Sequence, residues 1–180
     1  MGWKTLKERF GIGHIVQVTS AGIVIGSGYV SDLVTINPAT GKVTENSTFS
    51  GFLRGHCPVL LSASADEILA AINAEDTFAT SSPVYTYQGG TIIEKFCENP
   101  GYPNVTHDGC LMYENTYSTD KSMVVRWAKR NAEAGISLIT RYIADTEKRI
   151  AEQRDELEKS ENDLADLDAA FPELVAADRS

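Results

Sequence analysis

The densest set of side chains able to do chemistry lies in the loop 102–109, which reads YPNVTHDG. Asn104, Thr106, His107 and Asp108 supply amide, hydroxyl, imidazole and carboxyl groups within five positions. Together they offer donors and acceptors suited to the edge of a base or to a ribose. The alternative is an ordered surface loop whose polar groups bond to its own backbone. The residues alone leave both interpretations open.

Basic side chains follow this loop at the start of a predicted helix. They are Lys121, Arg126, Lys129 and Arg130. Residues four apart share one face of a helix, so Arg126 and Arg130 lie side by side there. Guanidinium and ammonium groups bind phosphates, and we therefore include Lys121 and Arg126 among the candidate ligand residues. A solvated helix start is the alternative.

Aromatic residues are concentrated between positions 85 and 117. They are Tyr85, Tyr87, Phe96, Tyr102, Tyr113 and Tyr117. The ordinary interpretation is packing in the core and at the edge of a sheet. The alternative is a stacking wall for a purine ring, because any aromatic face can cover a base.

Other kinds of site find little support in the residue spacing. The three histidines and three cysteines lack the HxxxH and CxxC spacings of metal sites, so we expect no metal. His107, Asp108 and Cys110 are nearly consecutive, and neighbouring residues rarely aim at one another as a catalytic triad must. No glycine-rich phosphate loop is present. We therefore expect a protein that is not an enzyme and carries no cofactor.

The composition indicates a globular chain that is not expected to bind polyanions. Of the 180 residues, 42% are hydrophobic and 23% are charged, as in ordinary globular domains. The net charge of −9 argues against nucleic-acid and anionic-membrane partners, because phosphates recruit lysine and arginine. The first ten residues lack the apolar core of a secretory signal, and no run reaches the roughly 18 apolar residues of a membrane span. With an odd number of cysteines, these features predict a cytoplasmic protein.

Short apolar segments separated by turn residues predict a β-rich body. The expected strands of the first part cover residues 14–19, 23–25, 33–36 and 43–49. No helix of crossover length interrupts them, so we expect a four-stranded antiparallel meander. Ser64 and Glu67 match a capping box, which predicts a short helix ending near Asn73. A second hairpin is expected from 83–87 and 91–97, and a last short strand from 111–113.

One long helix is predicted over residues 119–171. No Gly or Pro occurs between Ile136 and Phe171, and apolar residues recur there in steps of three and four. That is a heptad pattern, interrupted by Thr146, Gln153 and Ser160, and it predicts packing in a homo-oligomer. The expected α+β fold therefore has a body over 1–118, the helix over 119–171 and a flexible tail over 172–180.

Several segments resemble a known family when they are taken together. They are 4–16 (KTLKERFGIGHIV), 83–87 (PVYTY), 93–98 (IEKFCE), 101–109 (GYPNVTHDG), 113–120 (YENTYSTD) and the helix start MVVRWAKRNAEAGI. In combination they resemble the phage Thoeris anti-defence sponges, over much of positions 4–140. The resemblance implies a β-rich oligomer with long helices. It also implies binding of cyclic ADP-ribose-type immune signals, in some members cyclic oligonucleotides as well, without cleavage.

The resemblance also selects among the candidate ligand residues. The loop residues Asn104, Thr106, His107 and Asp108 lie in segments that carry it, and so does Phe96. Lys121 and Arg126 are added on charge and proximity alone. The leading hypothesis is thus a phage protein that sequesters a cyclic nucleotide signal in the host cytoplasm.

The acidic end of the chain supports a different hypothesis. From position 145 onward there are twelve acidic and five basic residues, so this stretch carries −7 of the net charge of −9. Such a helix could occupy a basic surface of a host protein. The alternative function is therefore a protein–protein inhibitor or adaptor that acts through its C-terminal helix.

Overall fold

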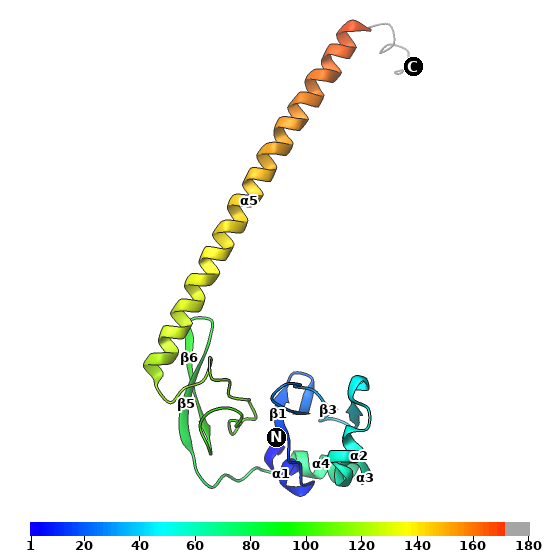
Figure 1. Ribbon diagram of the computed structural model, residues 1–180, viewed down its shortest axis with the longest axis vertical. Coiled ribbons are helices and arrows are strands. Elements are labelled where there is room, and N and C mark those ends of the chain that lie inside the picture. The colour runs from blue at the N-terminus through cyan, green and yellow to red at the C-terminus, as the bar shows by residue number, and fades with distance from the viewer. Residues whose placement is uncertain (172–180) are drawn as a thin grey trace. The chain divides into compact units, whose positions relative to one another are not determined.

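The computed structural model describes residues 1–171 and has an α+β fold, with antiparallel sheets followed by one long helix (Figure 1). The chain divides into two compact units, Met1–Arg130 and the part from Asn131 onward. The expected tail 172–180 and the expected stop at Pro172 lie outside the described residues.

The first sheet is the predicted four-stranded antiparallel meander. Its strands, in spatial as in chain order, are β1 (Ile15–Thr19), β2 (Gly22–Gly26), β3 (Val34–Ile36) and β4 (Val43–Glu45). The last strand is shorter than the expected 43–49, because the Asn46 side chain accepts the Thr48 N–H at 3.0 Å and caps the 3₁₀ helix η1 (Ser47–Phe49).

Four short helices pack with this sheet. They are α1 (Trp3–Arg9), α2 (Phe52–His56), α3 (Pro58–Ser62) and α4 (Ala65–Asn73). The capping box of α4 is confirmed, since Ser64 Oγ accepts the Glu67 N–H and the Glu67 carboxylate accepts the Ser64 N–H at 2.9 Å. The sequence did not predict α1, whose Leu6 is fully buried in one apolar cluster with strands and α4.

The second sheet is the predicted hairpin of β5 (Ser82–Gln88) and β6 (Thr91–Cys97). Its register places Val84 opposite Lys95, and Val84 packs with Cys97 and Met112 in a second apolar cluster. Side chains alternate across a strand, so Phe96 lies on the other face of this sheet. The prediction of a strand at 111–113 was wrong. The backbone there forms one isolated β-bridge, between Leu111 and Val105.

The long helix α5 (Lys121–Ala170) runs without a break for 50 residues, or about 75 Å at 1.5 Å per residue (Figure 1). It begins two residues later than expected, because Asp120 accepts the Ser122 N–H at 2.8 Å and so caps the first turn. Within residues 1–171, no helix has the length and apolar character needed to cross a bilayer.

Candidate functional site

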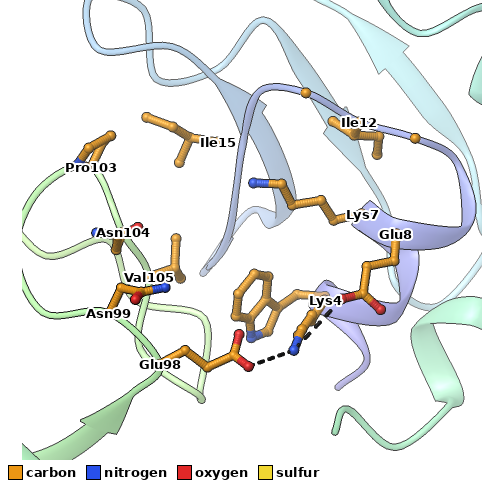
Figure 2. A pocket seen from close by; sticks show the side chains of 13 residues that line it. Lys4, Lys7, Glu8, Ile12, Ile15, Glu98, Asn99, Pro103, Asn104 and Val105 are labelled. Carbon is orange, nitrogen blue, oxygen red and sulfur yellow. Dashed lines mark hydrogen bonds and ion pairs between the residues drawn. The ribbon is translucent and has the colours of Figure 1, made fainter. Parts of the chain in front are cut away.

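A cavity of about 410 Å³ lies in the first unit (Figure 2). On one side it is bounded by α1 and the segment that follows α1, and on the other side by the loop that follows β6. Lys7 and Glu8 line one wall, together with Ile12 and Ile15. The opposite wall comes from the loop residues 98–105. Its volume is in the range of small-molecule sites.

The helix α1 divides its side chains between the core and the cavity. Leu6 is buried in the apolar cluster, while Lys4, Lys7 and Glu8 lie three and four positions apart and line the cavity. Trp3 also lines it, and its indole Nε1 donates to the His107 carbonyl at 3.0 Å. That bond ties α1 to a loop more than one hundred positions away.

Lys4 is fully engaged by neighbouring groups. Its Nζ lies 2.8 Å from a Glu98 carboxylate oxygen, donates to the Thr77 carbonyl at 2.8 Å and sits 5.1 Å from the centre of the Phe78 ring. The hydrogen bond to Glu98 raises the pKa of Lys4, and the same bond lowers the pKa of Glu98. Lys4 therefore helps to close the cavity and has little capacity left for a ligand.

Lys7 is the cation of the cavity that remains unpaired. Among the described residues, no carboxylate lies within ion-pair distance of its ammonium and no hydrogen bond holds it. Its side chain points into the space between α1 and the loop (Figure 2). Burial lowers the pKa of Lys7, because partial removal from water disfavours the charged form. A charged group held at such a cost is suited to receive an anion.

Two amide side chains face Lys7 from the loop. Asn99 and Asn104 line the cavity on that side (Figure 2), and neither amide side chain bonds to another residue within 1–171. Pro103 and Val105 add apolar surface beside them. The cavity thus combines the unpaired Lys7, two amides and apolar walls with two carboxylates, Glu8 and Glu98, that both lie within ion-pair distance of Lys4. The unpaired cation and the amides are groups that can orient a small anionic molecule.

Of the seven residues predicted as ligand contacts, Asn104 is the one that lines this cavity. Thr106 is fully buried and organises its own loop. Its hydroxyl donates to the Asp108 carboxylate and accepts the Cys110 N–H at 3.0 Å. The Thr106 side chain therefore bonds within its own loop, as in the interpretation of this segment as an ordered surface loop.

Asp108 and His107 are likewise engaged in packing and pairing. The Asp108 carboxylate lies 2.6 Å from Lys95 Nζ. Burial opposes ionisation of this pair, but their hydrogen bond outweighs it, so the pKa of Asp108 is lowered and that of Lys95 is raised. The His107 ring stacks on Phe78 at 3.8 Å between centres, and its buried Nε2 has no partner among the described residues.

The remaining three predicted residues lie apart from the cavity lining. Phe96 is exposed on the far face of the β5–β6 sheet. Lys121 lies at the first position of α5 with its Nζ 5.7 Å from the centre of the Tyr85 ring. Arg126 lies five residues further along α5 and pairs with Asp120 at 3.8 Å. The structure does not gather the seven residues into one cavity.

Sequence reasoning missed Lys7 and Asn99. The available signal for Lys7 was its position four residues after Trp3 in the amphipathic start of the chain, which places both side chains on one side of a helix. In the sequence, that stretch argues against a secretory signal and, within 4–16, contributes to the family resemblance, but it does not single out a ligand contact. Asn99 stands directly after β6, within the loop, and no pattern separated it from other turn residues.

Among residues 1–171, no group of three His, Cys, Asp or Glu side chains has the arrangement of a metal site. Comparison of the chain with protein-family models, with curated protein sequences and with solved structures finds no match. The function must therefore be argued from the geometry of the cavity and from the exposed helix.

Proposed function

We propose that this protein binds a small anionic ligand of the cyclic nucleotide class in the cavity beside Lys7, and sequesters it without cleaving it. The observation that carries the proposal is the partly buried, unpaired Lys7 ammonium in a cavity of about 410 Å³. A phosphate group would pair with Lys7.

The rest of the cavity lining fits the remaining parts of such a ligand. The amides of Asn99 and Asn104 supply donors and acceptors for a base edge or a ribose. Ile12, Ile15 and Val105 offer apolar contact to the flat face of a ring. In this proposal Asn104 keeps its predicted role, and Lys7 takes the phosphate-binding role assigned from the sequence to Lys121 and Arg126.

The proposal includes a homo-oligomer formed through α5 and action in the cytoplasm of a host cell as a phage-encoded immune-evasion protein. Its exposed apolar stripe supports the oligomer. The sequence resemblance to the anti-defence sponges supports the biological setting. Binding without turnover distinguishes the proposal from an enzyme that degrades the same signal.

Ligand capture tests the proposal directly. The purified protein is incubated with a panel of cyclic ADP-ribose isomers and cyclic dinucleotides, freed from unbound compound and denatured, and the released compound is identified. We expect one compound to be recovered intact. Recovery of a converted product would contradict sequestration, and recovery of nothing would contradict binding of this ligand class.

Matched variants then test the site. Lys7→Met should lower the affinity for the captured compound at least tenfold, because the loss of a partly buried charge-assisted hydrogen bond is worth about 1.5–3 kcal/mol. Lys121→Met removes the same charge outside the cavity and should leave the affinity unchanged. If Lys121→Met abolishes capture and Lys7→Met does not, the ligand binds at the start of α5.

A second candidate function is an adaptor or inhibitor that binds a basic host surface. The observation that favours it is the acidic, exposed surface of α5 beyond position 145. Replacing Glu152, Asp155 and Glu158 together by their amides removes charge from one side of the helix while sparing the apolar stripe. Loss of anti-defence activity with unchanged ligand capture would favour the adaptor.

A further inference from the structure

From Ile136 onward, α5 carries an apolar residue at every seventh position. These residues, the a positions of the heptad, are Ile136, Ile143, Ile150, Leu157 and Leu164, and Phe171 continues the spacing one residue past the end of α5. The d positions between them are Ile139, Thr146, Gln153, Ser160 and Leu167. The large apolar side chains of this stretch are 47% to 66% exposed, so no described part of the chain covers the stripe.

Two of the three polar d residues are already satisfied within the helix. Thr146 Oγ1 donates to the Tyr142 carbonyl at 2.7 Å, and Ser160 Oγ donates to the Glu156 carbonyl at 2.9 Å. A hydroxyl bonded in this way can enter an apolar seam without leaving a donor unpaired. Thr146 and Ser160 therefore do not prevent a dry interface with a second helix, whereas Gln153 needs a partner there.

The charges beside the stripe disfavour a parallel pair. In a parallel, in-register coiled coil each g residue faces the e residue five positions further along on the partner helix. The facing pairs would be Arg149 with Arg154, Glu156 with Glu161, and Asp163 with Asp168. All three pairs carry like charges, and each occurs twice in a dimer.

One antiparallel register brings three of these charges, Arg149, Arg154 and Glu156, into attractive pairs. When Ile150 faces Gln153 of a second copy, Arg149 faces Glu156 and Glu147 faces Arg154, each of them twice. Glu161 and Asp163 then face the uncharged Thr140 and Tyr142, and Asp168 faces Glu133 near the end of the paired stretch. The core layers are then Ile136 with Leu167, Ile139 with Leu164, Ile143 with Ser160, Thr146 with Leu157, and Ile150 with Gln153. Every polar d residue is thus packed against a large apolar residue.

We infer that α5 pairs with α5 of a second copy as an antiparallel coiled coil whose twofold axis passes between Ala151 and Glu152. A shift of one heptad in one direction brings Arg149 against Arg149, and in the other direction Glu156 against Glu156. Charge complementarity therefore selects this register over its neighbours as well as over the parallel pair.

Gln153 adds a further constraint on the register. The two copies of this residue flank the twofold axis in adjacent layers, where their amides can bond to each other. A buried polar pair helps to specify register at some cost in stability. A parallel in-register pair would also bring the two Gln153 amides together, so the charges, and not Gln153, disfavour that arrangement. The inference rests on the homo-oligomer of the proposed function and is independent of the ligand.

Disulfide cross-linking tests the pairing in the full-length chain. In the inferred register Ile143 faces Ser160 of the second copy, so the double variant Ile143→Cys/Ser160→Cys should form a covalent dimer on oxidation. Ser160→Cys alone should not, because the two Ser160 residues lie about 25 Å apart along the helices. The wild-type chain measures the background from the native cysteines.

Each outcome of the cross-linking has one meaning. Cross-linking of Ser160→Cys alone would overturn the antiparallel arrangement in favour of the parallel one. A dimer by sedimentation in which neither variant cross-links would overturn the register. A chain that sediments as a monomer at 100-fold the concentration of the cross-linking assay would overturn the oligomer as well. None of these results depends on ligand capture, which tests the cavity separately.

A charge-reversal series gives an independent readout. Arg149→Glu should weaken the dimer about tenfold, because it makes two attractive pairs repulsive. The double variant Arg149→Glu/Glu156→Arg should restore the affinity. Lys148→Glu, with the same charge change outside the seam, should leave it unchanged. A tighter dimer from Arg149→Glu alone would indicate parallel pairing and overturn the inference.

Discussion

Lys7 and Lys4 show how two like side chains on one helix acquire different roles. Lys4 is held by Glu98, Thr77 and the Phe78 ring, and its pKa is raised. Lys7, three positions away, has no such partner among the described residues, and burial lowers its pKa. The first lysine stabilises the fold, and the second destabilises it while remaining available to a ligand. A residue whose charge costs stability is a good candidate for function.

Because the partly buried charge of Lys7 is expected to lower the stability of the fold, replacing Lys7 should raise the free energy of unfolding in a pH-dependent way. Because the folded-state pKa lies below the unfolded value, the unfolded chain binds the proton more tightly and the fold is penalised at neutral pH. Lys7→Met should therefore raise the free energy of unfolding at pH 7 by about 0.5 kcal/mol. The gain should shrink as pH rises through the lowered pKa towards the unfolded value, as denaturant titrations at several pH values would show. A constant gain across that range would mean that packing, not charge, is responsible.

Thr106 is predicted to stabilise its loop through the hydrogen bonds of its hydroxyl, and not to contact a ligand. Thr106→Val keeps the shape but leaves the Cys110 N–H without its acceptor, which should cost about 1–3 kcal/mol of folding free energy. Thr106→Ser keeps the hydroxyl and should cost less. Thermal unfolding of both variants compares them, and equal losses would assign the effect to the methyl group instead.

At the scale of elements, the loop after β6 is held in place by contacts with distant strands and helices. The Val18 N–H donates to the Gly109 carbonyl at 2.8 Å, and the His107 N–H donates to the Phe96 carbonyl at 2.8 Å. Gly109 has φ of +86°, and a Cβ there would collide with the Val18 side chain. This glycine lets the loop approach β1 closely and so helps to form the cavity wall.

Two glycines of this loop form a matched pair for testing that role. Gly101 has φ of +93° with open space around it, whereas Gly109 combines positive φ with the contact to Val18. Gly101→Ala should cost about 1 kcal/mol from backbone strain, and Gly109→Ala a further 1–3 kcal/mol from the clash. Urea unfolding measures both. Equal costs would show that the approach to β1 is not tight.

At the scale of the whole molecule, the exposed apolar stripe of α5 is the feature that the inferred pairing would cover. In proteins most of the stability of a helix comes from packing of its apolar face, and α5 has no described neighbour over its apolar stripe. Pairing with a second copy buries that stripe and supplies the missing hydrophobic contribution. The inferred dimer would carry two copies of the cavity in one assembly.

Leu157→Glu is predicted to dissociate this assembly. It places a charge in the seam opposite Thr146, and it should raise the dimer dissociation constant at least 100-fold, because burial of an unpaired carboxylate costs several kcal/mol. Leu138→Glu makes the same change at an exposed apolar residue outside the a and d positions and should have little effect. Sedimentation equilibrium measures both, and dissociation by Leu138→Glu as well would place the interface on another face.

The sequence alone determined the features that depend on local periodicity and local hydrogen bonding. Alternation around Val16 and Val34 predicted the meander, the pair Ser64 and Glu67 predicted the start of α4, and the heptads predicted α5. These predictions are confirmed because a strand, a capping box and a helix each depend on neighbours within a few positions. The same periodicity, with the charges beside it, carries the inferred antiparallel register.

Only the tertiary structure decided which polar residues meet. The cavity joins residues from the first fifteen positions to a loop about ninety positions later, through contacts such as the bond from Trp3 to His107. Within the loop, spacing could not separate Asn104, which lines the cavity, from Thr106, which turns inward and holds the loop together. That choice depends on how α1 and β1 pack against the loop, and such long-range contacts leave no periodic signal in the chain.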